Sequence, residues 1–230
     1  KELCMNILYE LVMPAFYVGN HSLHYAIVNR MNTITLKHGL SKWSPRSFAL
    51  AGQHFISNNH DFKEGYRLAQ VGLVLLGDYK QTKMGGNVVY TVAIIKACIE
   101  PAVSCLDLLL TAYKISMEAG HIDAAVSSIF NYFWSFFYSG LPFNSLLDDI
   151  KRFSQQILDY KRHYMFLLVL PLWQCLLNLT GQAKDPTNME VGSAIEMESL
   201  VGGNPNGAGR QPLLSYWMQL NFYFGNVDKA

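Results

Sequence analysis

Apolar residues recur along most of this chain at intervals of three and four, the spacing that gathers them on one face of an α-helix. The clearest stripe consists of Leu146, Ile150, Phe153 and Ile157, with charged and amide side chains between its members. The same spacing predicts helices over these segments: 2–17, 23–38, 44–57, 62–76, 88–99, 101–118, 122–138, 145–158, 163–179 and 213–223. The sequence therefore predicts an all-α protein.

Several residues mark where these helices begin and end. Ser44-Pro45 is a start signal, with serine as the N-cap and proline at the first helical position. Pro14 is expected to kink or end the first helix, because proline lacks the backbone N–H that a helix interior uses. Residues 78–86 are polar and finish in two glycines, so we expect a link between helices there.

Two glycines lie inside the predicted helix 62–76. Gly65 and Gly72 are seven residues apart and therefore share one helix face. Each costs about 1 kcal/mol of helix stability relative to alanine. The close approach of a neighbouring helix explains why such positions lack a side chain, so we expect a packed helix pair here.

A six-residue turn occurs three times, at 60–65, 120–125 and 225–230. Each copy begins with a small polar turn, has an apolar residue third and a small residue sixth. The residues that form this repeat-turn signature are Gly65, Gly120, Ala125, Gly225 and Ala230. In a helix hairpin the small sixth residue leaves room for the partner helix, as in the turn of a tetratricopeptide repeat (TPR).

The copies are not evenly spaced, because 60 and 105 residues separate their starts and neither is a multiple of 34. We therefore predict a TPR-like α-solenoid of antiparallel helix pairs with irregular units. Its helical repeat domain covers 1–180, and a further, truncated unit begins at 212. Residues 181–211 are rich in glycine, asparagine and proline and are expected to form a long flexible loop. An irregular globular helical domain is the alternative.

Seven aromatic residues crowd the segment 130–138 and cannot all face one way around a helix. Core packing accounts for most of them. We expect Tyr132 and Trp134 to reach a groove or a neighbouring domain, because aromatic side chains are favoured anchors at protein interfaces. These two residues are the candidate partner-binding residues.

Composition excludes some classes of partner. Lysine and arginine number 18 and aspartate and glutamate 17, a net charge of +1, so no strong attraction to nucleic acid or to an anionic membrane is expected. The cysteines are Cys4, Cys98, Cys105 and Cys175, without a CxxC pair. Buried reduced thiols in a cytoplasmic protein are the interpretation of this pattern.

No catalytic or cofactor motif is present. The glycines of 202–209 lack the lysine of a phosphate-binding loop, and no zinc-protease or kinase signature occurs. His21 and His24 are three residues apart, but no third ligand is suitably spaced, so we interpret them as capping or surface residues and expect no metal or cofactor. The apolar run 164–173 is too short to span a bilayer, which needs about 20 residues.

Several stretches resemble the helical region that follows the ATPase module in large multidomain signalling kinases. The matching residues are Met13-Pro-Ala-Phe-Tyr17, Ile34-Thr-Leu-Lys-His-Gly39, Ser47-Phe-Ala-Leu-Ala-Gly52, Gly65-Tyr-Arg-Leu-Ala69, Ala112-Tyr-Lys-Ile-Ser-Met-Glu-Ala-Gly-His121, Tyr138-Ser-Gly-Leu-Pro142, Trp173-Gln174 and Leu179-Thr-Gly181. The resemblance covers most of 5–180, in order. It departs at 181–211, where this chain has a longer and more glycine-rich insert.

Such kinases combine a protein-kinase domain, an Orc1-like AAA (STAND-type) ATPase, this TPR-like region, a GAF domain and a histidine-kinase or cyclase output. The resemblance implies a non-catalytic interaction and regulatory module whose partners are proteins, either neighbouring domains or signalling partners. None of the family's ATPase or kinase residues has a counterpart here. The alternatives are an all-helical enzyme with an apolar pocket and a membrane-associated helical protein.

Overall fold

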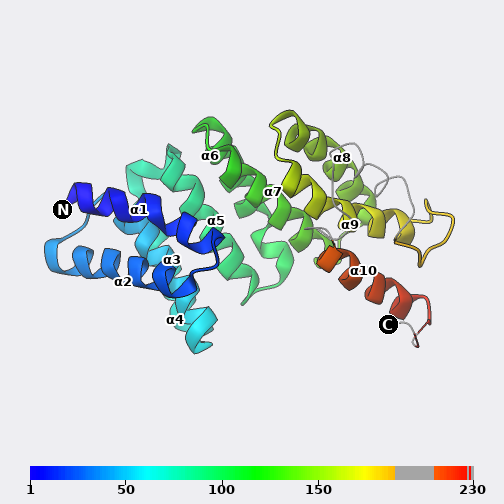
Figure 1. The fold of residues 1–230 in the computed structure, drawn as a ribbon, viewed down its shortest axis with the longest axis horizontal. Coiled ribbons are helices and arrows are strands. Elements are labelled where there is room, and N and C mark those ends of the chain that lie inside the picture. The colour runs from blue at the N-terminus through cyan, green and yellow to red at the C-terminus, as the bar shows by residue number, and fades with distance from the viewer. Residues whose placement is uncertain (190–209, 227, 229–230) are drawn as a thin grey trace. The chain divides into compact units, whose positions relative to one another are not determined.

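The computed structural model describes residues 1–189, 210–226 and 228, and this part of the chain contains helices and no strand. Short turns join most successive helices (Figure 1). The elements are α1 (Glu2–Tyr17), α2 (His21–His38), α3 (Ser44–Asn59), α4 (Phe62–Leu76), η1 (Gly77–Gln81), α5 (Lys83–Ala97), η2 (Ala102–Cys105), α6 (Leu106–Glu118), α7 (Ile122–Phe137), α8 (Phe143–Asp159), α9 (His163–Leu179) and α10 (Arg210–Tyr223). The prediction of an all-α, helical-repeat fold is confirmed.

The chain forms two compact units, Lys1–Asn131 and Tyr132–Ala230. In the N-terminal unit α1 packs on α2, α3 on α4, and α5 on α4 and α6. Two groups of buried apolar residues form its core, one around Val28 and Met31 and one around Val88 and Val92. In the C-terminal unit α9 packs against both α8 and α10.

The pair α3 and α4 is held together by backbone contact. A Cβ added to Gly72 would lie 2.6 Å from the Pro45 carbonyl oxygen, and one added to Gly65 would lie 2.7 Å from that of Gly52. Both distances are shorter than real Cβ contacts, so the partner backbone occupies the space of the missing side chains. The expected close approach at Gly65 and Gly72 is confirmed.

The predicted helix over 2–17 is confirmed, whereas the predicted link at 78–86 is wrong. Pro14 lies inside α1, which continues to Tyr17. The buried neighbours Val12 and Ala15 keep the last turn packed in spite of the hydrogen bond that proline cannot make. The expected link at 78–86 is mostly helical, because Thr82 caps α5 by accepting the N–H of Gly85 and both glycines lie in its first turn.

Ser44 is the first residue of α3 and not its N-cap, a position that Trp43 occupies. Its hydroxyl accepts the N–H of Ser41 at 3.0 Å and lies 2.9 Å from the hydroxyl of Thr35. These bonds tie the start of α3 to α2 and to the preceding turn. As a result the first helical residues, which normally face solvent, are buried, Arg46 among them.

The turns between paired helices share one backbone geometry. A residue at the C-cap or directly after it is left-handed, with φ of +72° at Gly19, +54° at His60, +67° at Gly120 and +56° at Lys161. After Gly19, Gly120 and Lys161, the following N–H bonds to the carbonyl five residues earlier, which satisfies a free carbonyl of the helix end. Gly225 has the same sign of φ, at +80°.

In the turns at 60–65 and 120–125 the sixth residues, Gly65 and Ala125, are buried. The third residues are less buried than the sixth, since Phe62 is exposed and Ile122 is only partly buried. The sixth residue of the third copy, Ala230, lies outside the described residues.

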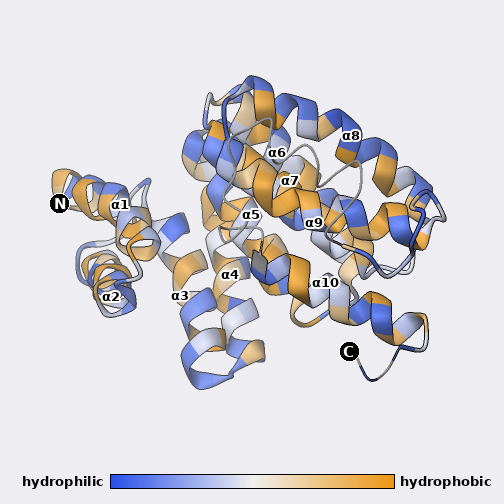
Figure 2. Cartoon of the chain, turned by 45° about the vertical axis from the view of Figure 1, so that its right-hand side comes forward, coloured by the Kyte–Doolittle hydropathy of each residue, from blue (hydrophilic) through white to orange (hydrophobic). Residues whose placement is uncertain are grey.

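The C-terminal unit follows the predicted pattern closely. Leu146, Ile150, Phe153 and Ile157 are all buried, while the hydrophilic residues of α8 lie on another side of the helix (Figure 2). The apolar run falls in α9, and no helix in the described ranges has the length and apolarity to span a membrane.

The expected loop at 181–211 lies mainly outside the described residues, which omit 190–209. Its described start is anchored to α9. The side-chain amide of Asn178 donates to the carbonyls of Pro186 at 3.2 Å and Asn188 at 2.7 Å, and Met189 is fully buried.

Candidate functional site

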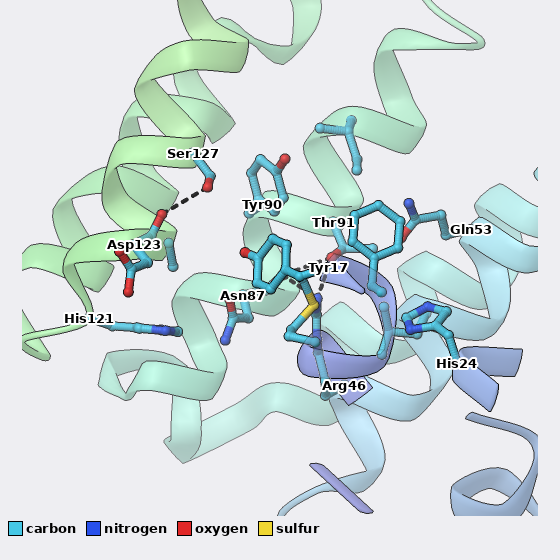
Figure 3. A pocket seen from close by; sticks show the side chains of 15 residues that line it. Tyr17, His24, Arg46, Gln53, Asn87, Tyr90, Thr91, His121, Asp123 and Ser127 are labelled. Carbon is cyan, nitrogen blue, oxygen red and sulfur yellow. Dashed lines mark hydrogen bonds between the residues drawn. The ribbon is translucent and has the colours of Figure 1, made fainter. Parts of the chain in front are cut away.

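A cavity of about 250 Å³ lies within the N-terminal unit (Figure 3). It is lined by residues from α1, α2, α3 and α5 and from the segment around the start of α7. The lining residues are Met13, Phe16, Tyr17, His24, Arg46, Leu50, Gln53, Asn87, Tyr90, Thr91, Ile94, His121, Asp123, Ala124 and Ser127. Aromatic and aliphatic walls thus surround a few polar groups, the usual composition of a small-molecule site.

Arg46 is the most unusual group in this cavity, because its residue is only 3% exposed. One terminal nitrogen, Nη1, donates to the backbone carbonyl of Asn87 at 2.8 Å and to the hydroxyl of Thr91. The other, Nη2, has the thioether sulfur of Met13 at 3.6 Å. The Nε–H is buried and has no hydrogen-bond partner.

The charge of Arg46 is therefore stabilised by neutral groups. Burial lowers the pKa of the guanidinium, and the nearby Tyr9, Tyr90 and Tyr17 act in the opposite direction. An arginine starts from a pKa so high that it remains a cation at neutral pH. Its described hydrogen-bond partners are a carbonyl, a hydroxyl and a sulfur, and none is a carboxylate.

His24 is buried, which corrects the interpretation of this residue as a surface or capping histidine. Its Nδ1–H donates to the carbonyl of Val12 at 2.9 Å, and its ring lies 5.0 Å from the ring of His54. Burial lowers the pKa of both histidines, that of His54 to about 3, so both are neutral at pH 7. In the described ranges no three metal-ligating side chains come together.

The exposed residues of the lining mark the opening of the cavity, and they are Phe16 and Tyr17 on α1 and Asp123 on α7. The hydroxyl of Ser127 donates to the backbone carbonyl of Asp123 at 2.8 Å (Figure 3). Burial lowers the pKa of His121, against a raising influence from Asp123. Asp123 is the carboxylate in the lining, so the cavity presents one cation within and one anion at its edge.

This arrangement is suited to binding. The polar groups are held on helices and face a space walled by Phe16, Leu50 and Tyr90. The lining contains no cysteine, and its serine hydroxyl is already engaged with the backbone. A guanidinium fork and aromatic walls recognise a ligand by charge and shape.

The structure separates the two candidate partner-binding residues. Tyr132 is 5% exposed, and its hydroxyl donates to Asp149 Oδ2 at 2.6 Å, so it belongs to the core of the C-terminal unit and has little surface to offer a partner. Trp134 is 49% exposed and contacts the ring of Tyr138 edge-on. A role for Trp134 in partner binding stays a prediction.

The four cysteine thiols are free, but only Cys105 and Cys175 are buried. Cys4 and Cys98 are exposed, which corrects the expectation that all four are core residues. Cys4 lies on α1, and Cys98 is the C-cap residue that follows α5.

Sequence reasoning also missed Arg46. The apolar residues Phe48, Ala51, Phe55 and Ile56 of α3 are only partly buried, whereas the buried residues of this helix include Arg46, Ala49, Leu50 and His54. The signal was present, because Arg46, Leu50 and Gln53 step by four and three and so share one face. A charged residue in such a stripe normally indicates a helix surface.

No protein-family model matches the chain, and no solved structure matches it. The chain is similar to the hybrid signal transduction histidine kinase G of Dictyostelium discoideum, with 25% identity over 185 residues. This match covers 78% of the chain but 5% of the relative, so the chain spans about a twentieth of that kinase's length. The similarity associates the chain with a signal-transduction kinase.

Proposed function

We propose that this chain is a non-catalytic helical-repeat module that mediates protein contacts and regulation within a multidomain, ATP-dependent signalling protein. The observation that carries the proposal is the similarity to a segment of a hybrid histidine kinase. The resembling stretches over 5–180 occur in the same order as in signalling kinases with an Orc1-like AAA (STAND-type) ATPase. This order supports our proposal that the parent protein is of that kind. The partners are then other domains of the same polypeptide or signalling proteins, in the cytoplasm.

Exposed apolar stripes on two helices support a role in protein contacts. On α1, Leu3, Ile7 and Leu11 are exposed and step by four. On α10, Leu214, Met218 and Phe222 are exposed and have the same spacing. Apolar side chains that line up along one helix face offer a groove-filling surface to another protein.

The proposed mechanism is differential contact. A module that contacts one conformational state of a neighbouring ATPase or kinase more strongly than another shifts the population toward the first state. Closely packed helix pairs such as α3 and α4 suit this role. Because their interior is tightly packed, such a pair moves as one rigid body when a neighbouring domain contacts it.

Calorimetry with ATP and Mg²⁺ tests the non-catalytic part of this proposal. The chain of residues 1–230 should show no heat of binding, because its sequence lacks a phosphate-binding loop. A dissociation constant on the order of 1 µM would contradict the proposal.

Site-specific photo-crosslinking tests the contact role in the full-length open reading frame that encodes this chain. A photoreactive residue at Met218 should form a crosslink to a protein domain outside this chain. The control is the same residue at Lys151, an exposed position on the polar side of α8. Equal crosslinking at both positions would show that the α10 stripe is not a specific contact surface.

A further inference from the structure

Arg46 carries a charge that the described structure leaves without a counter-ion. Moving a charged side chain out of water costs several kcal/mol, and proteins usually recover this through a paired carboxylate. Here the guanidinium is buried, and its hydrogen-bond partners are neutral. The printed partners of Arg46 thus include no carboxylate, and the carboxylate of the lining, Asp123, is an exposed residue.

The unused hydrogen-bonding capacity of Arg46 lies along one edge. A guanidinium has five N–H donors, and its Nε and Nη2 atoms form a fork that matches the two oxygens of a carboxylate. Nε–H has no partner, and Nη2 has only the sulfur of Met13, a weak acceptor at 3.6 Å. The strong bonds all belong to Nη1, which anchors the group to α5. Met13 also lines the cavity, and its flexible side chain can yield this edge to an oxygen ligand.

We propose that this cavity is a binding site for a small organic monocarboxylate with an apolar or aromatic body. The carboxylate binds the Nε and Nη2 edge of Arg46, and the body packs among Phe16, Leu50 and Tyr90. Gln53 is a further polar group of the lining. This inference is independent of the proposed contact function, since it concerns only the interior of the N-terminal unit.

Charge balance favours a carboxylate over a phosphate. Arg46 is the cation of the lining, and the cavity histidines are neutral at pH 7 because burial lowers the pKa of His24 and His121. The free edge of Arg46 pairs with one monoanionic carboxylate, whereas a phosphate dianion would bring a second negative charge into a partly apolar cavity whose lining already contains Asp123. The volume of about 250 Å³ fits a small acid.

The competing explanation is a purely structural arginine that only joins α3 to α5. The two explanations differ in one observable, the accessibility of the Nε–H edge to an added anion. Nuclear magnetic resonance detects this N–H directly in the isotope-labelled chain, so the wild-type protein is sufficient for the test.

The experiment titrates the chain with isovalerate and phenylacetate and, in parallel, with their uncharged primary amides. We expect phenylacetate to bind with a dissociation constant on the order of 1 mM or below, to raise the melting temperature and to shift the Arg46 Nε–H resonance. The amides should bind roughly tenfold more weakly, since a charge-assisted pair is about twice as strong as a neutral hydrogen bond.

Variants and a second anion complete the test. Arg46→Lys keeps the charge but loses the fork, and it should weaken phenylacetate binding about tenfold. Arg30→Lys, at an exposed position on α2, is the matched control and should bind like the wild type. Inorganic phosphate should bind more weakly than phenylacetate.

Three results would overturn the proposal. The first is an Arg46 Nε–H resonance that neither carboxylate moves at about ten times the expected dissociation constant. The second is equal affinity for phenylacetate and its amide, which would show an apolar cavity without anion recognition. The third is phosphate binding tighter than carboxylate binding, which would assign the site to another anion.

Discussion

Arg46 and His54, two ionisable residues of α3, respond differently to burial. Arg46 stays charged because its pKa begins far above neutrality, and its environment supplies acceptors for part of its N–H groups. His54 begins near neutrality and loses its proton, with burial as the main cause and the neighbouring His24 as a second. Its Nε2 is buried without a hydrogen-bond partner, and the ring packs edge-on against Tyr25 at 4.2 Å. Two buried positions of the same helix therefore hold a cation in one case and a neutral ring in the other.

His54 should make the stability of the chain depend on pH. The unfolded histidine takes up a proton near pH 6.5, whereas the pKa in the folded chain is about 3. Between these values the unfolded state binds more protons, so stability falls as the pH is lowered from about 6.5 toward 3. Melting temperatures measured from pH 7 to 4 should decrease less steeply for His54→Phe than for the wild type. His38→Phe, at an exposed position, should keep the wild-type profile; a matching profile for both variants would contradict this role of His54.

Gly72→Ala should destabilise the chain by about 2 kcal/mol, because the new methyl group meets the backbone of Pro45 and Ala49. This loss exceeds the gain of about 1 kcal/mol that alanine brings to a helix interior. Denaturant unfolding measures the difference. Val74→Ala, on the same helix but exposed, should change the free energy of unfolding by less than about 0.5 kcal/mol. A stabilised Gly72→Ala variant would show that the α3–α4 contact is looser than described.

At the scale of elements, amphipathicity distinguishes α8 from α1 and α10. All apolar stripe residues of α8 are buried, so a single packing interface covers the apolar face of this helix. α10 buries Tyr216 and Leu220 but exposes the stripe of Leu214, Met218 and Phe222. A helix that is apolar on two sides is typical of an element placed between two packing surfaces. Only one of these surfaces belongs to the described part of the C-terminal unit.

Charge substitutions on the two sides of α10 should therefore have unequal effects. Leu220→Glu places a carboxylate in a fully buried position. It should lower the free energy of unfolding by about 4 kcal/mol or more, or prevent folding. Met218→Glu should change the free energy of unfolding by less than about 1 kcal/mol, because about half of that side chain is already in water. Circular dichroism during urea unfolding compares the two. Equal destabilisation would place Met218 in the core and remove the α10 stripe as a contact surface.

At the scale of the whole molecule, the nearly balanced charge limits the kinds of partner. A net charge of +1 over 230 residues gives no strong overall attraction to the phosphate backbone of nucleic acid. In the described part of the chain Arg152 pairs with Asp149 and Lys96 with Glu100, partners that are three and four residues apart in sequence. Recognition by exposed apolar side chains and by the buried Arg46 suits proteins and small molecules better than nucleic acid.

The chain should not bind duplex DNA at physiological salt. Fluorescence anisotropy with a labelled duplex should give a dissociation constant weaker than about 100 µM, the weak limit of non-specific binding. A chain carrying several added lysines on the polar side of α8 would be the positive control. Binding of the unmodified chain that is much tighter and falls steeply with salt would contradict the charge argument.

The sequence by itself determined the helices, most of their ends and the close approach at Gly65 and Gly72. These features depend on local periodicity and on backbone sterics, which neighbouring residues in the chain encode. It did not identify which face of α3 is buried, the burial of Tyr132 or the cavity around Arg46. Those depend on residues that are far apart in sequence, such as Met13, Arg46 and Thr91, and only packing brings them together. Whether a charged side chain lies on a surface or in a cavity is decided by its neighbours in space, and hence by the tertiary structure alone.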